Sequence, residues 1–269
     1  MAWAMTKLTD HVSYADAQRL CSPARLWELF DGDRERLNIG HECIDRHPAE
    51  RPAVRIVHSP EHGEHDEVLT FGALAAWSSR FAHFLAERGV GPGERVGIML
   101  EPSLPFYAGL FGAVKRGAIA VPLFTLFGPD GLRLRIDDCT PRLLLVSPGQ
   151  AEIARDVPGV VTVVADSGFL DALARYPDRY RPDTPADAVA VFQYTSGTTR
   201  ELPAAVRHSH RSIVTLMIAA LYGTGIRPGE TSRRRGAQSS MRRRRPSGPK
   251  RVKSGTAMAP CFIAPKRPA

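Results

Sequence analysis

The chain has 269 residues, of which 43% are hydrophobic and 24% charged, and its formal net charge is +8. These proportions are typical of a globular domain rather than of a disordered or fibrous chain. Residues 231–269 hold nine Arg, three Lys and no acid, a charge of +12, which leaves −4 on residues 1–230. The positive net charge of the chain therefore comes from residues 231–269, and it does not predict a basic binding face on the first 230 residues.

The N-terminal sequence MAWAMTKLTD lacks the long apolar stretch of a signal peptide. The longest apolar run, residues 213–226, is interrupted by Thr and Gly and is too short to cross a bilayer. We therefore expect a cytoplasmic protein with no membrane partner. Residues 1–37 are mixed and polar, and we interpret them as an N-terminal extension with a short helix in SPARLWELFD.

From Leu69 onward helical and strand patterns alternate. LTFGALAAWSSRFAHFLAERG places Leu74, Trp77 and Phe81 on one helical face and ends at a glycine. Further helices are predicted in SLPFYAGLFGAVKRG and PDGLRLRIDDC. Apolar strands are predicted at residues 95–100, in AIAVPLF, in PRLLLVS, and at residues 159–165 and 188–194. Strands separated by helices predict an α/β fold, a mostly parallel sheet with helices on both faces.

The last of these strands continues into five small residues: Thr195, Ser196, Gly197, Thr198 and Thr199. In open α/β sheets, ligands bind at the carboxyl ends of the strands. A glycine among hydroxyl side chains suits an anion, because backbone N–H groups can converge on it and the hydroxyls donate further hydrogen bonds. The alternative is a Ser/Thr-rich surface turn. Neither a GxxxxGK[ST] loop nor a GxGxxG turn in a strand–helix context occurs.

The stretch YTSGTTRELPAAVRHSH resembles the phosphate-binding signature of the adenylate-forming (AMP-dependent) ligases, which include acyl-CoA synthetases, luciferases and peptide-synthetase adenylation domains. The helix–strand–helix–strand segment that starts at LTFGALAAW is similar to the early part of that family. NIGHECIDRH is similar to the opening segment of acetyl-CoA-synthetase-like members. The resemblance covers residues 38–230, which we interpret as part of an AMP-binding domain with the N-terminal fold of that family.

This resemblance implies an ATP-dependent carboxylic acid–CoA ligase that forms an acyl-adenylate and then a thioester. ATP, Mg²⁺ and CoA would take part, and the partners would be a nucleotide and a carboxylic acid. By position, the five residues of TSGTT would hold the β- and γ-phosphates of ATP.

The signature departs from its usual form after TSGTT. Arg200 stands where a Gly is usual, one extra residue precedes Pro203, and Ala204 replaces a Lys. Arg200 either restores the lost positive charge to a phosphate or faces solvent, and we include it among the phosphate-binding candidates. His208 and His210 are expected to shape the junction between a strand and the next helix rather than to exchange protons.

Two basic residues end the helix predicted in SLPFYAGLFGAVKRG. Lys115 and Arg116 suit the dipole at that end and receive no catalytic role.

Beyond Glu230 the periodicity stops, and residues 231–269 are expected to be disordered. A shifted reading frame in GC-rich DNA is favoured over a genuine basic tail that binds nucleic acid, and the coding DNA just after Gly229 would decide between them. The acyl pocket, the adenine and ribose contacts, the Thr-Glu pair for Mg²⁺, the catalytic Lys and the CoA site of the family find no match. We therefore expect a truncated, inactive fragment. The alternative is a non-catalytic nucleotide-binding remnant with a basic tail.

Overall fold

The computed structural model describes residues 7–11, 13–57, 66–155, 157, 159–194 and 205–220. The chain divides into two compact units, one made of Met1–Leu29 with Val214–Ala269 and the other of Phe30–Ile213. The predicted tail, residues 231–269, lies outside the described residues.

In the first unit, short helices begin at serine caps. The Ser13 side chain accepts from the backbone N–H of Asp16 before α1, and Ser22 caps α2, which starts with a proline where that residue costs least. The second of these is the helix predicted in SPARLWELFD. The helical elements are η1 (Leu8–Asp10), α1 (Tyr14–Leu20), α2 (Pro23–Trp27) and α8 (Ser212–Ile218), the last of which starts in the second unit.

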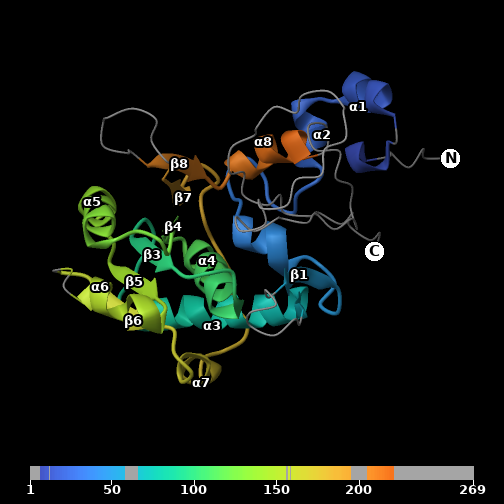
Figure 1. The fold of residues 1–269 in the computed structure, drawn as a ribbon. Coiled ribbons are helices and arrows are strands. Elements are labelled where there is room, and N and C mark those ends of the chain that lie inside the picture. The colour runs from blue at the N-terminus through green and yellow to red at the C-terminus, as the bar shows by residue number, and fades with distance from the viewer. Residues whose placement is uncertain are drawn as a thin grey trace, which may run out of the picture. The chain divides into compact units, whose positions relative to one another are not determined.

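The second unit contains a six-stranded sheet in the order β6-β5-β3-β4-β7-β8 (Figure 1). Every neighbouring pair is parallel except β7 and β8, which are antiparallel. The prediction of an α/β fold with a mostly parallel sheet is confirmed. The strands are β3 (Arg95–Met99), β4 (Ile119–Pro122), β5 (Leu143–Val146), β6 (Val161–Val164), β7 (Val189–Gln193) and β8 (Val206–Ser209).

Helices cover both faces of this sheet, and two apolar clusters lie beneath them. Successive residues of β5 alternate between these clusters: Leu143 and Leu145 belong to one, Leu144 and Val146 to the other. The first cluster holds residues of α3 (Phe71–Glu87), α4 (Leu104–Arg116) and α7 (Phe169–Ala174), and the second those of α5 (Pro129–Cys139) and α6 (Ala151–Arg155).

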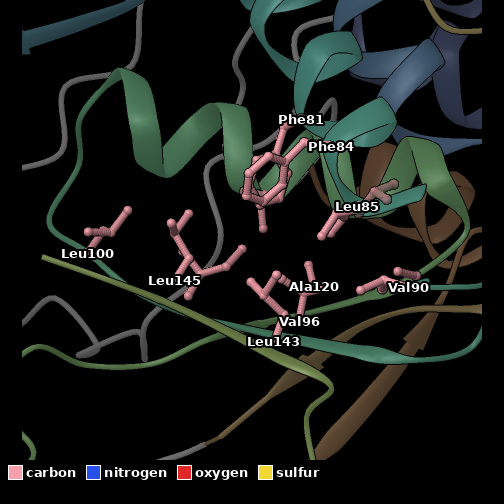
Figure 2. Packing of buried hydrophobic residues seen from close by; sticks show 14 of the residues in the cluster. Phe81, Phe84, Leu85, Val90, Val96, Leu100, Ala120, Leu143 and Leu145 are labelled. Atoms are coloured by element: carbon pink, nitrogen blue, oxygen red, sulfur yellow. The ribbon is translucent and has the colours of Figure 1, made fainter. Parts of the chain in front are cut away.

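The first cluster is the larger, and its buried aromatic side chains are Phe81 and Phe84 from α3 and Phe169 from α7. Figure 2 shows Phe81 and Phe84 lying over the strand residues Val96 and Leu143. Helices α3 and α4 approach each other closely at Gly112, where an added Cβ would lie 2.7 Å from the carbonyl oxygen of Ser78. A side chain at that position would push the two helices apart.

Three elements of the second unit that precede α3 were not predicted. Strands β1 (Pro52–Val57) and β2 (Asp66–Thr70) form a separate antiparallel pair. The segment NIGHECIDRH contains one turn of π-helix, η2 (His41–Asp45), in which Cys43 and Ile44 are buried. A 3-10 turn, η4 (Pro148–Gln150), follows β5.

The sheet is not uniform along its width. Strands β3 and β4 are in register over four residue pairs, whereas β4 and β7 share the single pair Ala120 and Val191. The assigned ladder between the parallel part of the sheet and the antiparallel β7–β8 hairpin is therefore short.

Candidate functional site

The hydroxyl-rich segment connects β7 to β8 at the carboxyl edge of the parallel strands. Both ends of this connection are described, but the six phosphate-binding candidates lie outside the described residues. They are Thr195, Ser196, Gly197, Thr198, Thr199 and Arg200. Gln193 of β7 pairs with Val206 of β8. Residues 195–204, here called the β7–β8 loop, therefore leave and rejoin the sheet at neighbouring points on the edge where α/β proteins bind ligands.

The first end of this loop is fixed by Tyr194, which is buried. Its hydroxyl donates to the Asp138 carboxylate, with 2.6 Å between oxygens, and lies 3.2 Å from the carbonyl oxygen of Arg135. Burial and the Asp138 hydrogen bond raise the pKa of Tyr194, so the phenol stays protonated and acts as a donor. Sequence reasoning quoted Tyr194 in the signature but gave it no role, because its partners on α5 are more than 50 residues away.

The side chains beneath Tyr194 add to this attachment. The Arg135 guanidinium lies 3.7 Å from the ring centre of Phe127 and 5.7 Å from that of Tyr194, a stacking arrangement that favours a fixed side chain. Burial raises the pKa of the neighbouring Cys139 thiol to about 11, so this thiol is not a nucleophile at neutral pH. The cluster is structural and holds Tyr194, the residue that precedes the loop.

The second end of the loop is fixed by His210, just after β8. Its backbone N–H donates to Ala188 O over 3.0 Å, and its carbonyl accepts from the N–H of Ile213 at the start of α8. The imidazole is fully buried, and its Nδ1 accepts from the backbone N–H of Ile39 over 3.1 Å. Burial lowers the pKa of His210 to about 4, so the ring is neutral. The expectation that this histidine shapes the junction between strand and helix is confirmed.

Polar side chains also follow the strands next to β7. Thr125, after β4, donates its hydroxyl to Glu101, after β3, and its carbonyl accepts from Gln150 Nε2 over 2.8 Å. These bonds tie together the carboxyl ends of three adjacent parallel strands. Sequence reasoning missed these residues, because no local motif brings them together.

A buried ion pair of Lys115 lies away from this edge. Helix α4 ends at Arg116 as predicted, and the Lys115 side chain in its last turn is fully buried in an ion pair, which the sequence did not reveal. Its Nζ lies 2.5 Å from Asp45, 3.1 Å from the carbonyl oxygen of Ala75 and 3.2 Å from Ser79 Oγ. Lys115 thus joins η2 and α3 to α4 and has no part in the loop.

Metal clusters and membrane-spanning helices are absent from the described residues. In the part of the chain that the structure describes, no group of three or more His, Cys, Asp and Glu side chains could hold a metal ion. Over the same residues, none of the helices combines the length and apolarity that a membrane span requires.

A mostly parallel sheet with helices on both faces and a Ser/Thr/Gly segment at its carboxyl edge matches the N-terminal fold of the adenylate-forming ligases. Residues 41–234 match the family model of the AMP-binding enzymes, and the chain belongs to this family. The Brucella canis acyl-CoA synthetase has the same fold, with a TM-score of 0.71 and 25% identity over 81% of this chain and 42% of that one.

Curated relatives include two acid–CoA ligases by name. The chain is 33% identical to the 3-hydroxybenzoate–CoA ligase of Aromatoleum sp. (strain CIB) over 60% of its own length and 33% of that protein. It is 34% identical to the acetyl-coenzyme A synthetase of Novosphingobium aromaticivorans over 64% of its own length and 31% of that protein. The chain therefore spans about a third of the length of these relatives.

Proposed function

We propose that this chain contributes the triphosphate-binding part of an ATP-dependent carboxylic acid–CoA ligase. The observation that carries the proposal is the placement of the β7–β8 loop, which starts and ends at the carboxyl edge of the sheet and is held by Tyr194 on one side and His210 on the other. A loop with fixed ends can present its N–H and hydroxyl groups to an anion without a large ordering cost. The names of the two acid–CoA ligase relatives support the acid–thiol class.

In this proposal the loop holds the pyrophosphate end of ATP. Gly197 gives the backbone room to turn its N–H groups toward phosphate, and the four hydroxyl side chains donate to the β- and γ-phosphate oxygens. Arg200 adds the positive charge that the replaced Lys would supply elsewhere in the family. When a carboxylate attacks the α-phosphate, negative charge grows on the departing pyrophosphate, and preorganised donors stabilise that charge.

Magnesium and CoA would also take part in the reaction. Hydroxyl oxygens are hard ligands of the kind that Mg²⁺ accepts, so Thr198 or Thr199 could face an ion bound to the phosphates. The ion would neutralise phosphate charge. CoA would accept the acyl group in the second half-reaction, and we assign no residue of this chain to it. We propose a cytoplasmic setting and a small carboxylic acid as substrate.

The direct test is nucleotide binding by the purified chain with Mg²⁺, measured by calorimetry. The double variant Thr198→Ala/Thr199→Ala should weaken ATP and pyrophosphate binding by about tenfold or more, because in this proposal the loop contacts the β- and γ-phosphates. Thr162→Ala, which removes a hydroxyl from β6 far from the loop, is the matched control. Equal ATP affinity in the double variant and the wild type would refute the proposal.

Adenylation by the 269-residue chain itself is measured by carboxylate-dependent pyrophosphate release. We expect no carboxylate-dependent pyrophosphate release with acetate, propionate, octanoate or benzoate, because no residue of this chain is assigned to the acid or to the α-phosphate, and adenylation needs both held in near-attack geometry. Release above that of the double variant would show that the chain completes adenylation.

A further inference from the structure

The two edges of the six-stranded sheet differ in how well they are protected against pairing with another chain. Strand β8 at one edge carries Arg207 and His208, and its ladder with β7 is irregular. Strand β6 at the other edge has the sequence VTVV, with no charge and no proline, and its register with β5 is regular over four residue pairs. Charges, prolines and bulges are the features that keep sheet edges from pairing. The β6 edge therefore lacks the protection that the β8 edge has.

The outward-pointing backbone groups of β6 belong to Thr162 and Val164. Val161 N donates to Arg142 O, and Ala165 N also donates to β5, so the odd-numbered residues of β6 face β5. Because these groups alternate along a strand, the N–H and C=O groups of Thr162 and Val164 point away from β5. Neither N–H has a hydrogen-bond partner among the described residues. Both residues are half-buried, and 51% of Val161 is exposed, so this edge is open to a further strand.

A second copy of β6 has the outward groups in the places that antiparallel pairing requires. With Val163 on a two-fold axis, Thr162 lies opposite Val164 of the second copy, and Val164 lies opposite its Thr162. Each of these pairs brings two outward-facing residues together and exchanges two hydrogen bonds. Val163 then faces Val163 of the second copy in a pair without hydrogen bonds. The strand is therefore complementary to itself over its whole length.

The same register brings opposite charges together at both ends of the paired strands. It places Asp166 of the second copy opposite Val160, which the β5–β6 ladder places beside Arg142. Residues that lie opposite one another point to the same face, so the three side chains share one face, and the Cα atoms of the two charged residues are about 10 Å apart. Arg142 and Asp166 are both exposed, and one Asp166 oxygen accepts from Gly168 N over 3.0 Å.

A pocket of about 380 Å³ lies at this corner of the sheet, and Arg142 and Val160 line it. Two carboxylates, Glu94 and Asp137, line it as well, and each already has a partner. Glu94 accepts from a backbone N–H of its own turn over 2.6 Å, and Asp137 lies 3.9 Å from a basic side chain of α5. The pocket thus leaves room and a positive charge for Asp166 of the second copy.

We propose that β6 is a self-association surface: two copies of the chain pair antiparallel through β6, with Val163 on the two-fold axis and an ion pair between Arg142 and Asp166 of the other copy at each end. Two strands of four residues bury less than the roughly 1,200 Å² of stable interfaces, so the dimer is weak and depends on concentration. The β7–β8 loop has no part in this contact, and the inference is independent of the proposed function.

Oxidative cross-linking of the full chain tests the register. The Cα atoms of an antiparallel pair without hydrogen bonds are about 4.5 Å apart, within the range of about 4.4–6.8 Å that disulfides span. Val163→Cys should therefore form a disulfide between two copies, identified by mass spectrometry as two identical tryptic peptides joined together. Val161→Cys is the matched control: it is the more exposed position, but it faces Ala165 of the second copy and should not cross-link. Cross-linking of Val161→Cys instead of Val163→Cys would overturn the proposed pairing.

Sedimentation velocity over a concentration series tests the ion pair. Arg142→Asp and Asp166→Arg each place like charges near one another, and each should raise the dissociation constant of the dimer by about tenfold. The double variant Arg142→Asp/Asp166→Arg restores opposite charges and should dimerise nearly as well as the wild type. A folded double variant, checked by circular dichroism, that dimerises no better than the single variants would contradict the pairing.

Hydrogen exchange shows where the copies meet. At high protein concentration the amides of Thr162 and Val164 should exchange more slowly than in dilute solution, whereas the Val163 amide, which faces β5, should not change. Association without slower exchange at Thr162 and Val164 would show that the copies meet elsewhere. A wild-type chain that stays monomeric at every concentration, with no disulfide in Val163→Cys, would overturn the proposal altogether.

Discussion

Asp45→Asn should destabilise the protein more than Lys115→Met, although both remove the same buried ion pair. The Lys115 ammonium is fully buried, while one fifth of the Asp45 side chain is exposed. Burial lowers the pKa of Lys115 and raises that of Asp45, and the attraction between the two opposes both shifts. At 2.5 Å the pair gains about 6–7 kcal/mol of Coulomb energy at an effective dielectric constant of about 20. Desolvation of both groups offsets most of that gain.

The two variants differ in the group that they leave behind. Asp45→Asn leaves a buried ammonium without its counter-charge, and removing one partner of a buried pair costs about 3–5 kcal/mol. Lys115→Met leaves a carboxylate that water reaches and that can take up a proton, and Met fills the space of the lysine stem. We expect that cost to be about 1–2 kcal/mol. The double variant should be less destabilised than Asp45→Asn alone.

Urea unfolding followed by tryptophan fluorescence and by circular dichroism measures these differences, provided that the slope with urea is unchanged. The surface pair Arg133 and Asp137, 3.9 Å apart and mostly exposed, supplies the control: Asp137→Asn should have no measurable effect. An Asp45→Asn cost below about 1 kcal/mol would refute the reasoning, because the ammonium would then have to be solvated or neutral. Additive effects in the double variant would refute it as well.

Three further predictions follow from packing, hydrogen bonding and titration. Gly112→Ala should destabilise the chain by about 1–3 kcal/mol in urea unfolding, because its Cβ would lie 2.7 Å from a backbone oxygen. Gly131→Ala in α5, whose Cβ would make only ordinary contacts, should stabilise the chain by about 0.5–1 kcal/mol. A change of stability in the same direction for both variants would contradict this. Tyr194→Phe should cost about 1–2 kcal/mol in urea and increase tryptic cleavage after Arg200, because the bond to α5 is lost; unchanged cleavage would show that the hydroxyl does not fix the loop. Burial lowers the pKa of both His47 and His210 from 6.5 to about 4. Between these pH values the unfolded chain binds protons that the folded chain does not. The free energy of unfolding should therefore decrease as the pH is lowered from about 6.5 to about 4, by up to about 1.4 kcal/mol per pH unit for each histidine. His210→Asn should reduce that slope.

The parallel part of the sheet was predictable from local patterns. Continuous apolar runs such as LLLV fit a strand covered on both faces, and the structure places alternate residues of β5 in two different clusters. The face of α3 that carries Leu74 and Phe81 was likewise visible in the sequence, and both residues are fully buried.

The contacts that hold the candidate site were not predictable in the same way. Tyr194 meets Asp138, and His210 meets Ile39 across 171 positions of the sequence. Lys115 of α4 pairs with Asp45 of η2, which is also distant in the sequence. Periodicity describes which face of an element is buried, but it does not identify which distant polar group will lie opposite.

The ladder between β4 and β7 joins parts of the chain that are far apart in the sequence. The pair Ala120 and Val191 lies about 70 residues apart, so closing it costs more chain entropy than pairing strands that are closer in the sequence. The β7–β8 hairpin is therefore expected to be the last part of the sheet to dock and the first to detach under native conditions. Native-state hydrogen exchange should show amides of β7 and β8 opening at a lower free energy than those of β3 and β5.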